Sequence, residues 1–389
     1  MSDLLLMGPG PSPVSERVRA AMSRPLYGHL DPRFLRELDG ISEDLRLCFG
    51  STAPLTFPVS GTGSAAMETA VLNLVWPGRR VLVLENGVFA ERISEMARRA
   101  GGELRRLSFP YGTPVDPEQA RQAMEEFRPD VVAVVHAETS TGVLNPVGAV
   151  AQAARDVSAR LIVDTVTSLG GMPVTMDEWG AAVVYSGRQK CLGCPPGLGP
   201  IWVAGAALAE RPKDLPVVSW YLDLGLIAKY LGTERLYHHT APISMVFALR
   251  EALTAVREEG LERRFARHRQ ASSALRAGLA AYGLGSLVRP GSELPSLSVV
   301  SAPEDQDEGR LRQELLEVED VEIAGGLGPW KGKAWRIGTM GEGANLDPVV
   351  RTLESIGRVL GRHGVAADVR EARRAAEEQW RAAAPALRA

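Results

Sequence analysis

Apolar and polar positions alternate in blocks through the middle of the chain, from residue 55 to residue 210. Short apolar runs rich in β-branched residues predict buried strands at 81–84, 131–135, 161–163 and 182–185. Longer stretches with helical spacing predict helices at 64–75, 89–100, 117–127 and 148–156. Apolar strands that alternate with helices are typical of an α/β fold, in which helices cover both faces of a mostly parallel sheet. Such sheets bind their ligands at the carboxyl ends of the strands.

The segment before this region follows another pattern. Gly and Pro residues at 8–13 predict an irregular arm, because proline lacks a backbone donor and disfavours helix in the residue before it. Helices are expected at 15–22, with Ser15 as the cap, and at 33–49.

After residue 243, the order of helices and strands predicts a smaller α+β domain. One or two long helices at 243–284 are interrupted at Gly260, and further elements are expected at 297–300, 308–317, 321–323, 335–337 and 347–361. The Ala-, Arg- and Glu-rich segment from Val365 predicts a terminal helix with a frayed end. The chain is therefore divided into an arm (1–20), a large domain (21–262), a small domain (263–364) and a helical tail (365–389).

Composition excludes several classes of function. Lys and Arg total 44 against 47 Asp and Glu, and this net charge of -3 offers no basic surface for a nucleic acid. Three cysteines among 389 residues are too few for a disulfide framework and suit a reducing compartment. The chain shows no signal-peptide pattern and no run of about 18 apolar residues. We expect a cytoplasmic protein with no membrane or nucleic-acid partner.

Three candidate features lie at predicted strand ends. A Gly-rich turn at 60–64 opens a helix, and it fits either a phosphate site or a plain strand–helix turn. Asp164 directly follows the strand at 161–163, where a ligand crevice is expected. Lys190 follows the next strand, and burial there would free its amine to form a Schiff base. A phosphate cup, a carboxylate for a pyridinium nitrogen and a Schiff-base lysine together match pyridoxal phosphate.

The sequence at these residues resembles the class V aminotransferases of PLP-dependent transferase fold type I, and more narrowly the alanine–glyoxylate / serine–pyruvate aminotransferase family. The resemblance extends from Gly8 to about Arg362. It is carried by MGPGPS at 7–12, VSGTG at 59–63, ETSTGV at 138–143, VDTVTSLGG at 163–171, YSGRQK at 185–190, YHHT at 237–240, GGLG at 325–328 and WRIG at 335–338. It implies a large domain with a mostly parallel seven-stranded sheet between helices, a smaller C-terminal α+β domain, and a homodimer with its sites at the interface.

The resemblance also implies individual roles. Lys190 is the catalytic Schiff-base lysine and proton shuttle, and Asp164 pairs with the pyridinium nitrogen. The other cofactor-binding residues are then Thr62, Gly63, Ser64, Gln189, Phe89, Thr139 and Val166, together with Tyr237 and Thr240 from the other subunit. Phe89 stacks on the ring where the family often has Trp, and it lacks the indole N–H. Arg336 clamps the substrate α-carboxylate, and Gly10, Gly28 and Thr139 are assigned to substrate binding.

Three features have simpler interpretations than their motifs suggest. Cys191 and Cys194 form a CxxC, but a structural zinc site needs four ligands and the chain has one further Cys, so we expect incidental packing and no metal. His238 and His239 are adjacent without an evident third ligand, which favours hydrogen bonding at an interface or in a loop. His136 ends a strand, and a structural hydrogen bond is expected for its side chain.

The predicted activity is a ping-pong aminotransferase that passes the amino group of alanine or serine to glyoxylate or pyruvate. A ureidoglycine–glyoxylate or an aspartate aminotransferase of the same family stays open, because few pocket residues distinguish them. A cysteine desulfurase is disfavoured because no Cys follows Cys194 as a nucleophile. A non-catalytic regulator is disfavoured because Lys190, Asp164 and Arg336 are all present.

Overall fold

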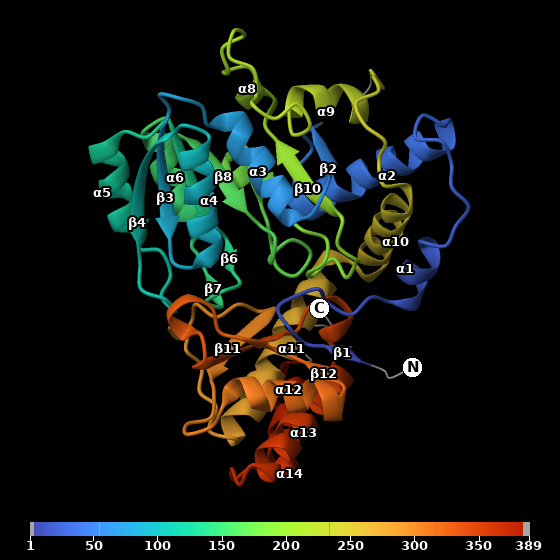
Figure 1. The fold of residues 1–389 in the computed structure, drawn as a ribbon, viewed down its shortest axis with the longest axis vertical. Coiled ribbons are helices and arrows are strands. Elements are labelled where there is room, and N and C mark those ends of the chain that lie inside the picture. The colour runs from blue at the N-terminus through green and yellow to red at the C-terminus, as the bar shows by residue number, and fades with distance from the viewer. Residues whose placement is uncertain (1–3, 54, 233, 384–389) are drawn as a thin grey trace.

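The large domain is built on a seven-stranded sheet in the computed structural model, which describes residues 4–53, 55–232 and 234–383 (Figure 1). The strand order is β2-β10-β9-β8-β5-β3-β4. The strands are β2 (Thr56–Ser60), β3 (Arg80–Glu85), β4 (Glu103–Ser108), β5 (Val131–Val135), β8 (Arg160–Asp164), β9 (Val183–Tyr185) and β10 (Leu198–Val203). All pairings are parallel except those of β10, which is antiparallel to both of its neighbours. The mostly parallel seven-stranded sheet is therefore confirmed.

Three strands of this sheet were not predicted: β2, β4 and β10. β4 reads Glu-Leu-Arg-Arg-Leu-Ser and lies at the sheet edge, where none of its residues is fully buried, so it lacks an apolar run. β10 begins inside the Gly- and Pro-rich stretch at 193–200, whose composition is typical of turns. Pro200 is tolerated there although the strand lies between two others.

The helices of this domain begin and end largely where the sequence indicates. They are α1 (Glu16–Ala21), α2 (Pro32–Phe49), α3 (Gly63–Leu74), α4 (Val88–Arg99), α5 (Pro117–Phe127), α6 (Val147–Asp156), α7 (Met176–Trp179), α8 (Gly205–Leu208), α9 (Leu224–Leu231) and α10 (Ile243–Glu259). Asp31 accepts the N–H of Arg33 at the start of α2, and Gly50 ends that helix in a left-handed conformation. Ser15 precedes α1, but its side chain makes no capping hydrogen bond, contrary to expectation.

The small domain combines helices with short strands below the large sheet (Figure 1). Its antiparallel sheet has the order β11-β14-β13. The elements are α11 (Leu261–Ala281), β11 (Leu297–Ser301), α12 (Glu308–Glu319), β12 (Val321–Glu322), β13 (Ala324–Gly325), η1 (Gly328–Trp330), β14 (Ala334–Gly338), η2 (Gly341–Gly343), α13 (Leu346–Arg362) and α14 (Val369–Ala383). Gly260 separates α10 from α11 at a φ of 81°, so the predicted break is present.

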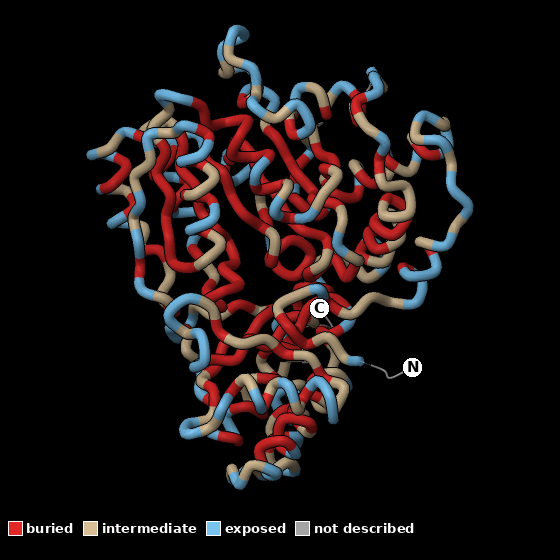
Figure 2. The backbone as a smooth tube through the Cα atoms, in the orientation of Figure 1, coloured by how far each residue is buried: buried red, intermediate tan, exposed pale blue. Residues whose placement is uncertain are grey.

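Buried apolar residues form one core around the large sheet, a second in the small domain, and a third that combines residues of both domains (Figure 2). The arm joins the two parts, because β1 (Leu5–Leu6) pairs in parallel with β12 before the chain returns to the large domain. The tail forms α14, which packs on α11 and α13 through buried Ala372 and Ala376. The expected frayed end at 384–389 lies outside the described residues, as do residues 1–3 of the arm.

Among the described helices, none is both long enough and apolar enough to cross a membrane.

Candidate active site

A cavity of about 150 Å³ opens at the carboxyl ends of the strands of the large sheet. It brings together segments that follow β2, β3, β8 and β9. The residues that line it are Thr62, Gly63, Ser64, Met67, Phe89, Arg92, Asp164, Val166, Gln189 and Lys190. The structure thus gathers eight of the predicted cofactor-binding residues around one cavity.

One end of the cavity is suited to a phosphate group. α3 begins here, and its N-cap residue Thr62 makes no side-chain capping hydrogen bond, so the first N–H groups of the helix and the hydroxyl stay available. Gly61 has a φ of 144°, and a Cβ on it would come within 2.5 Å of the Ala65 Cβ. Gln189 lines the same cavity, and its side-chain NH2 group is a further donor. These N–H and O–H donors fit an anion at the start of α3.

Asp164 ends β8 as a buried carboxylate held only by dipoles. Its Oδ1 accepts the N–H of Val166 at 2.8 Å, and its Oδ2 accepts the hydroxyl of Tyr185 at 2.8 Å. Burial raises its pKa to about 7, although these two hydrogen bonds act in the opposite direction. A cation placed opposite Asp164 would restore its charge, and a protonated pyridine nitrogen is such a cation.

Lys190 is also buried, and burial together with nearby Arg336 lowers its pKa to about 8. Its ammonium donates to the carbonyl oxygen of Pro9 in the arm. The arm crosses directly over the lysine: a Cβ on Gly10 would lie 2.5 Å from Lys190 Cδ. Ser12 fixes this crossing, because its hydroxyl donates to the Lys190 carbonyl at 2.8 Å. Gly10 therefore lies against Lys190, beside the cavity.

Arg336 lies in β14 of the small domain, and its side chain reaches Thr139 of the large domain. Its Nε donates to Gly325 O at 2.8 Å and its Nη1 donates to Thr139 O at 3.3 Å. Burial lowers its pKa to about 10, and no described carboxylate forms an ion pair with it. The Thr139 hydroxyl bonds that of Thr167. A buried guanidinium without a carboxylate partner fits a carboxylate ligand.

Two residues near the site escaped the sequence-based prediction. Arg92 lines the cavity and lies over the Phe89 ring at 4.8 Å, one helical turn further along α4. Glu138 is fully buried and accepts the N–H groups of Ala90 and Phe89 at 3.2 and 3.5 Å, as well as the Ser140 hydroxyl at 2.6 Å. Its place in the ETSTGV motif was a signal, but only the tertiary structure shows that it caps α4.

Six predicted residues do not line this cavity: Thr139, Arg336 and Gly10, which are described above, and Tyr237, Thr240 and Gly28. Tyr237 is 59% exposed, and its hydroxyl is 3.4 Å from that of Thr240. Gly28 is exposed, and no atom lies within 4 Å of where its Cβ would be. Tyr237 and Thr240 were assigned to the site of the other subunit, and Gly28 to substrate binding, and all three roles stay predictions.

The histidine and cysteine motifs form no metal site among the described residues. Cys191 and Cys194 are buried, and burial raises the pKa of each thiol to about 11. His238 and His239 bond each other through their Nδ1 atoms at 2.8 Å. The side-chain hydrogen bond expected for His136 is wrong: Nδ1 is buried without a partner, and the ring packs edge-on against Trp179.

The fold, together with a buried aspartate and a buried lysine at one cavity, defines the class of pyridoxal-phosphate enzymes. Comparison with known proteins then gives the family. The family model for aminotransferase class-V matches residues 15–328. The chain belongs to the class-V aminotransferases, so it is an aminotransferase, it uses pyridoxal phosphate, and amino acids and oxo acids are its substrates.

Three relatives illustrate the similarity. The alanine–glyoxylate aminotransferase of Rattus norvegicus is 35% identical over 361 residues, covering 92% of this chain and 87% of the relative. The crystal structure of the alanine–glyoxylate aminotransferase from Nostoc sp. is 42% identical, with a TM-score of 0.90 over 92% of this chain and 96% of the other. The crystal structure of the ureidoglycine–glyoxylate aminotransferase from Bacillus subtilis is 36% identical, with a TM-score of 0.95 over 98% of this chain and 99% of the other.

Proposed function

We propose that this enzyme transfers the amino group of a small amino acid, alanine or serine, to glyoxylate or pyruvate by a ping-pong cycle. The observation that carries the proposal is the buried guanidinium of Arg336, which two carbonyl oxygens orient and no described carboxylate neutralises. Both substrates of such a cycle carry a carboxylate beside the reacting carbon, so one clamp serves each half-reaction.

The residues that would hold the cofactor divide its groups among them. Thr62, Gly63 and Ser64 with Gln189 take the phosphate, Asp164 takes the ring nitrogen, and Phe89 and Val166 take the two faces of the ring. When bound, pyridoxal phosphate supplies an electron sink and carries the amino group between the half-reactions.

Lys190 is the group that moves the proton at the substrate Cα. Its pKa of about 8 lets it lose a proton near neutral pH and act as base, then return the proton as acid. Asp164, once opposite a cation, keeps its negative charge and holds the ring nitrogen protonated.

The position of the arm supports a small substrate side chain. The backbone of Pro9 and Gly10 lies against Lys190, so main-chain atoms limit the space beside the reacting amine. Glyoxylate as acceptor is supported by the names of the relatives from Nostoc and Bacillus subtilis. The Bacillus subtilis structure matches this chain over 98% of its length, and its name makes ureidoglycine a second candidate donor.

A substrate panel tests the proposal. Alanine, serine, aspartate and (S)-ureidoglycine are assayed as donors against glyoxylate, pyruvate and 2-oxoglutarate. We expect the highest kcat/KM with alanine or serine and glyoxylate, and parallel double-reciprocal lines, as a ping-pong cycle requires. A preference for ureidoglycine would replace the donor, and a preference for aspartate with 2-oxoglutarate would contradict the proposal of a small donor and acceptor.

Lys190→Ala tests the catalytic lysine. The purified wild-type protein should be yellow, and sodium borohydride should fix the cofactor onto Lys190 in a form that peptide mass spectrometry locates. The variant should lose turnover by several orders of magnitude, because both the covalent attachment and the proton shuttle are removed. Cofactor fixed to another lysine would overturn the assignment.

Arg336→Ala tests the clamp. Loss of a bidentate charged contact should raise KM for alanine and glyoxylate about a hundredfold, on the order of 3 kcal/mol. Arg92→Ala, which changes the other arginine at the site, should alter cofactor affinity rather than the KM values. Unchanged KM values in Arg336→Ala would mean that another group binds the carboxylate.

We also propose that the enzyme is a homodimer in which Tyr237 and Thr240 reach the phosphate of the partner subunit. The surface around α9 supports this proposal, because it exposes large apolar side chains: Val218 at 78%, Trp220 at 61%, Leu236 at 53% and Tyr237 at 59%. The same surface adjoins the phosphate end of the site, since the His239 ring bonds the Ser60 hydroxyl at 2.6 Å.

Trp220→Glu tests the dimer. A charge at the centre of the proposed interface should convert the wild-type dimer to a monomer in analytical ultracentrifugation and should lower cofactor affinity. Val318→Glu is the control, because Val318 is 61% exposed on α12 of the small domain. A monomeric wild-type protein with full activity would contradict the shared site.

A further inference from the structure

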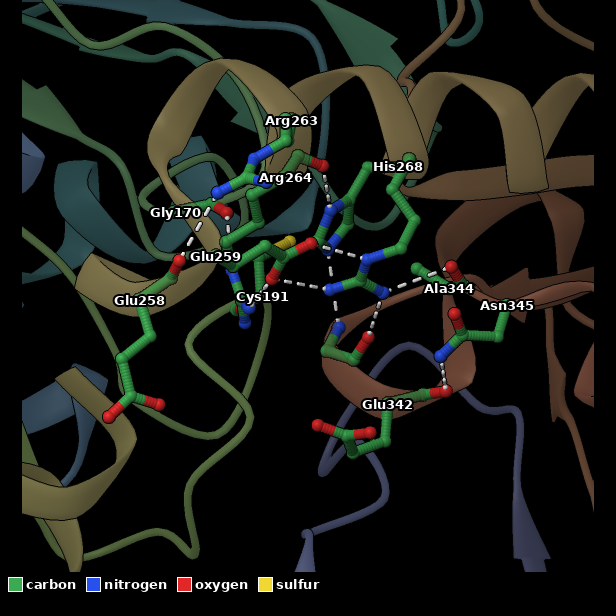
Figure 3. A network of polar contacts seen from close by, with 12 residues as sticks. Gly170, Cys191, Glu258, Glu259, Arg263, Arg264, His268, Glu342, Ala344 and Asn345 are labelled. Atoms are coloured by element: carbon green, nitrogen blue, oxygen red, sulfur yellow. Dashed lines mark hydrogen bonds and ion pairs between the residues drawn. The ribbon is translucent and has the colours of Figure 1, made fainter. Parts of the chain in front are cut away.

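A partly buried network of charged side chains occupies the junction of α10 and α11 (Figure 3). Glu259 is the last residue of α10, and Arg264, Arg267 and His268 lie on the first two turns of α11. The network sits between the two domains. Its contacts reach the segments that follow Asp164 and Lys190 on one side and the segment that follows Arg336 on the other.

Arg264 makes the contacts on the cofactor side. Its Nε donates to Gly170 O at 3.1 Å and its Nη2 donates to Cys191 O at 2.5 Å. Cys191 is the residue directly after Lys190, and Gly170 lies six residues after Asp164. The guanidinium is almost entirely buried, so these two carbonyls and Glu259 are its environment.

Arg267 makes the contacts on the substrate-clamp side. Its Nη1 donates to Gly341 O at 2.9 Å and to Ala344 O at 3.0 Å. These carbonyls belong to the loop that directly follows β14, the strand of Arg336. One arginine therefore fixes the loop after the clamp, one helical turn away from the arginine that fixes the loop after the lysine.

Glu259 joins the two arginines. Its Oε2 accepts from Arg264 Nη1 at 2.6 Å and from Arg267 Nη2 at 2.9 Å, and its Oε1 accepts from Arg267 Nε at 2.6 Å. Burial favours the neutral acid, but the two guanidinium groups outweigh it and lower the pKa of Glu259. Without this carboxylate, two cations would share a buried space with carbonyl oxygens alone.

His268 adds a directional link across the same junction. Its Nδ1 must donate to Arg264 O at 2.8 Å, because a carbonyl only accepts, so in the neutral ring its Nε2 accepts the N–H of Gly341 at 3.2 Å. Gly341 in turn touches the lysine segment: a Cβ on it would lie 2.9 Å from Gly193 Cα. The loops of the two domains thus meet at this histidine.

We propose that Glu259, with Arg264 and Arg267, is a positioning residue that keeps the Lys190 segment and the Arg336 strand in register across the two domains. The substrate is held at its carboxylate by one domain and reacts at an amine of the other. A fixed separation between the two is a condition for productive geometry. This inference rests on the roles proposed above for Lys190 and Arg336.

Hydrogen exchange tests the structural part without any chemistry. Glu259→Gln is compared with Glu258→Gln, which changes the neighbouring carboxylate that pairs with Arg17 on the surface. Exchange is followed by mass spectrometry in the full chain, both with cofactor and after its removal. In Glu259→Gln we expect amide exchange about tenfold faster than in the wild type, both at 189–194 and at 339–345. In Glu258→Gln both segments should exchange at the wild-type rate. Faster exchange in only one segment, or in neither, overturns the proposal.

Kinetics test the functional part. Arg267→Lys should raise KM for alanine and glyoxylate about tenfold, while the pH at which the cofactor's visible absorbance changes stays constant. Arg264→Lys should shift that pH and lower kcat, and the double variant should be non-additive because both act through Glu259. Arg263→Lys, on the exposed side of the same helix, is the control. Wild-type kinetics and absorbance in both buried variants would show a merely structural network and overturn the proposal.

These outcomes also separate the clamp from the proposed function. If Arg336→Ala leaves KM unchanged while Glu259→Gln loosens both segments, the role of Arg336 fails and the coupling of the two domains stands.

Discussion

Asp164, Lys190 and Arg336 are charged groups that burial disfavours, and each has a pKa moved towards its neutral form, to about 7, 8 and 10. None of them forms a direct ion pair with another described residue; hydroxyl, N–H and carbonyl groups hold them instead. On the roles proposed above, the cofactor and the substrate relieve this cost, so we expect the protein to gain stability when they bind.

Asp164→Asn should therefore stabilise the cofactor-free protein while it abolishes efficient catalysis. Above pH 7 the wild-type carboxylate is charged in both folded and unfolded states, and the folded state bears the whole cost of burial. As the pH falls through about 7 towards 3.8, the folded state binds a proton first and the cost disappears. The variant should be more stable by on the order of 3 kcal/mol at pH 8 and by little at pH 4.5.

Urea unfolding of cofactor-free protein at both pH values measures this difference. Tyr282→Phe is a control for a buried polar change outside the site, because the Tyr282 hydroxyl donates to Leu353 O. A stability gain that did not depend on pH would refute the electrostatic explanation.

At the scale of elements, the start of α4 decides where Phe89, the residue proposed to stack on the ring, lies. The first N–H groups of this helix donate to two side chains. Val88 N donates to the Ser140 hydroxyl at 2.9 Å, and Ala90 N donates to the Glu138 carboxylate. Gly87 leaves the space for this cap. Its φ of 172° is ordinary extended backbone, so the requirement concerns space and not conformation.

Gly87→Ala should displace the cap. The new Cβ would come within 2.4 Å of Ser140 Oγ and 2.5 Å of Glu138 Cδ, so the buried carboxylate or the helix must move. We expect a loss of about 1–3 kcal/mol in the free energy of unfolding, and weaker cofactor binding in an absorbance titration.

Gly148→Ala is the matched control, because it changes a glycine near the start of α6 with no atom within 4 Å of its Cβ. It should be neutral or slightly stabilising. Equal effects of the two substitutions would show that the α4 cap tolerates the methyl group.

At the scale of the whole molecule, the two ends of the chain hold the small domain in place. The arm adds β1 beside β12 and then crosses over Lys190, and α14 covers α11 and α13. The tail helix packs closely: a Cβ on Gly278 would lie 3.0 Å from Ala372 O. α14 is thus part of the core of the small domain.

Ala376→Glu should unfold the small domain more easily. It places a charge where Ala376 is completely buried, and we expect a loss of at least about 3 kcal/mol, measured by thermal or urea unfolding. Ala382→Glu, on the exposed side of α14, should change little. Similar stability of the two variants would mean that α14 does not contribute to the folded core.

The hydrophobic pattern predicted the strands that contain a continuous run of β-branched and other apolar residues. β5 is apolar along its length and β8 at its three central residues, and α5 begins at a capping Asp116 followed by Pro117, so local chemistry was sufficient. It missed β4, whose arginines suit an exposed edge, and β10, whose glycine and prolines resemble a turn. Partners on both sides make β10 a strand, and a single sequence contains no information about those partners.

The sequence by itself determined the chemical type of the site, because a lysine and an aspartate at successive strand ends must meet at one edge of a parallel sheet. It also determined the family through its motifs. Only the tertiary structure decided that Glu138 caps the helix of Phe89, that the arm crosses Lys190, and that Glu259 joins two arginines between the domains. These contacts connect residues far apart in the chain, and they form only when the packing of whole elements brings those residues together.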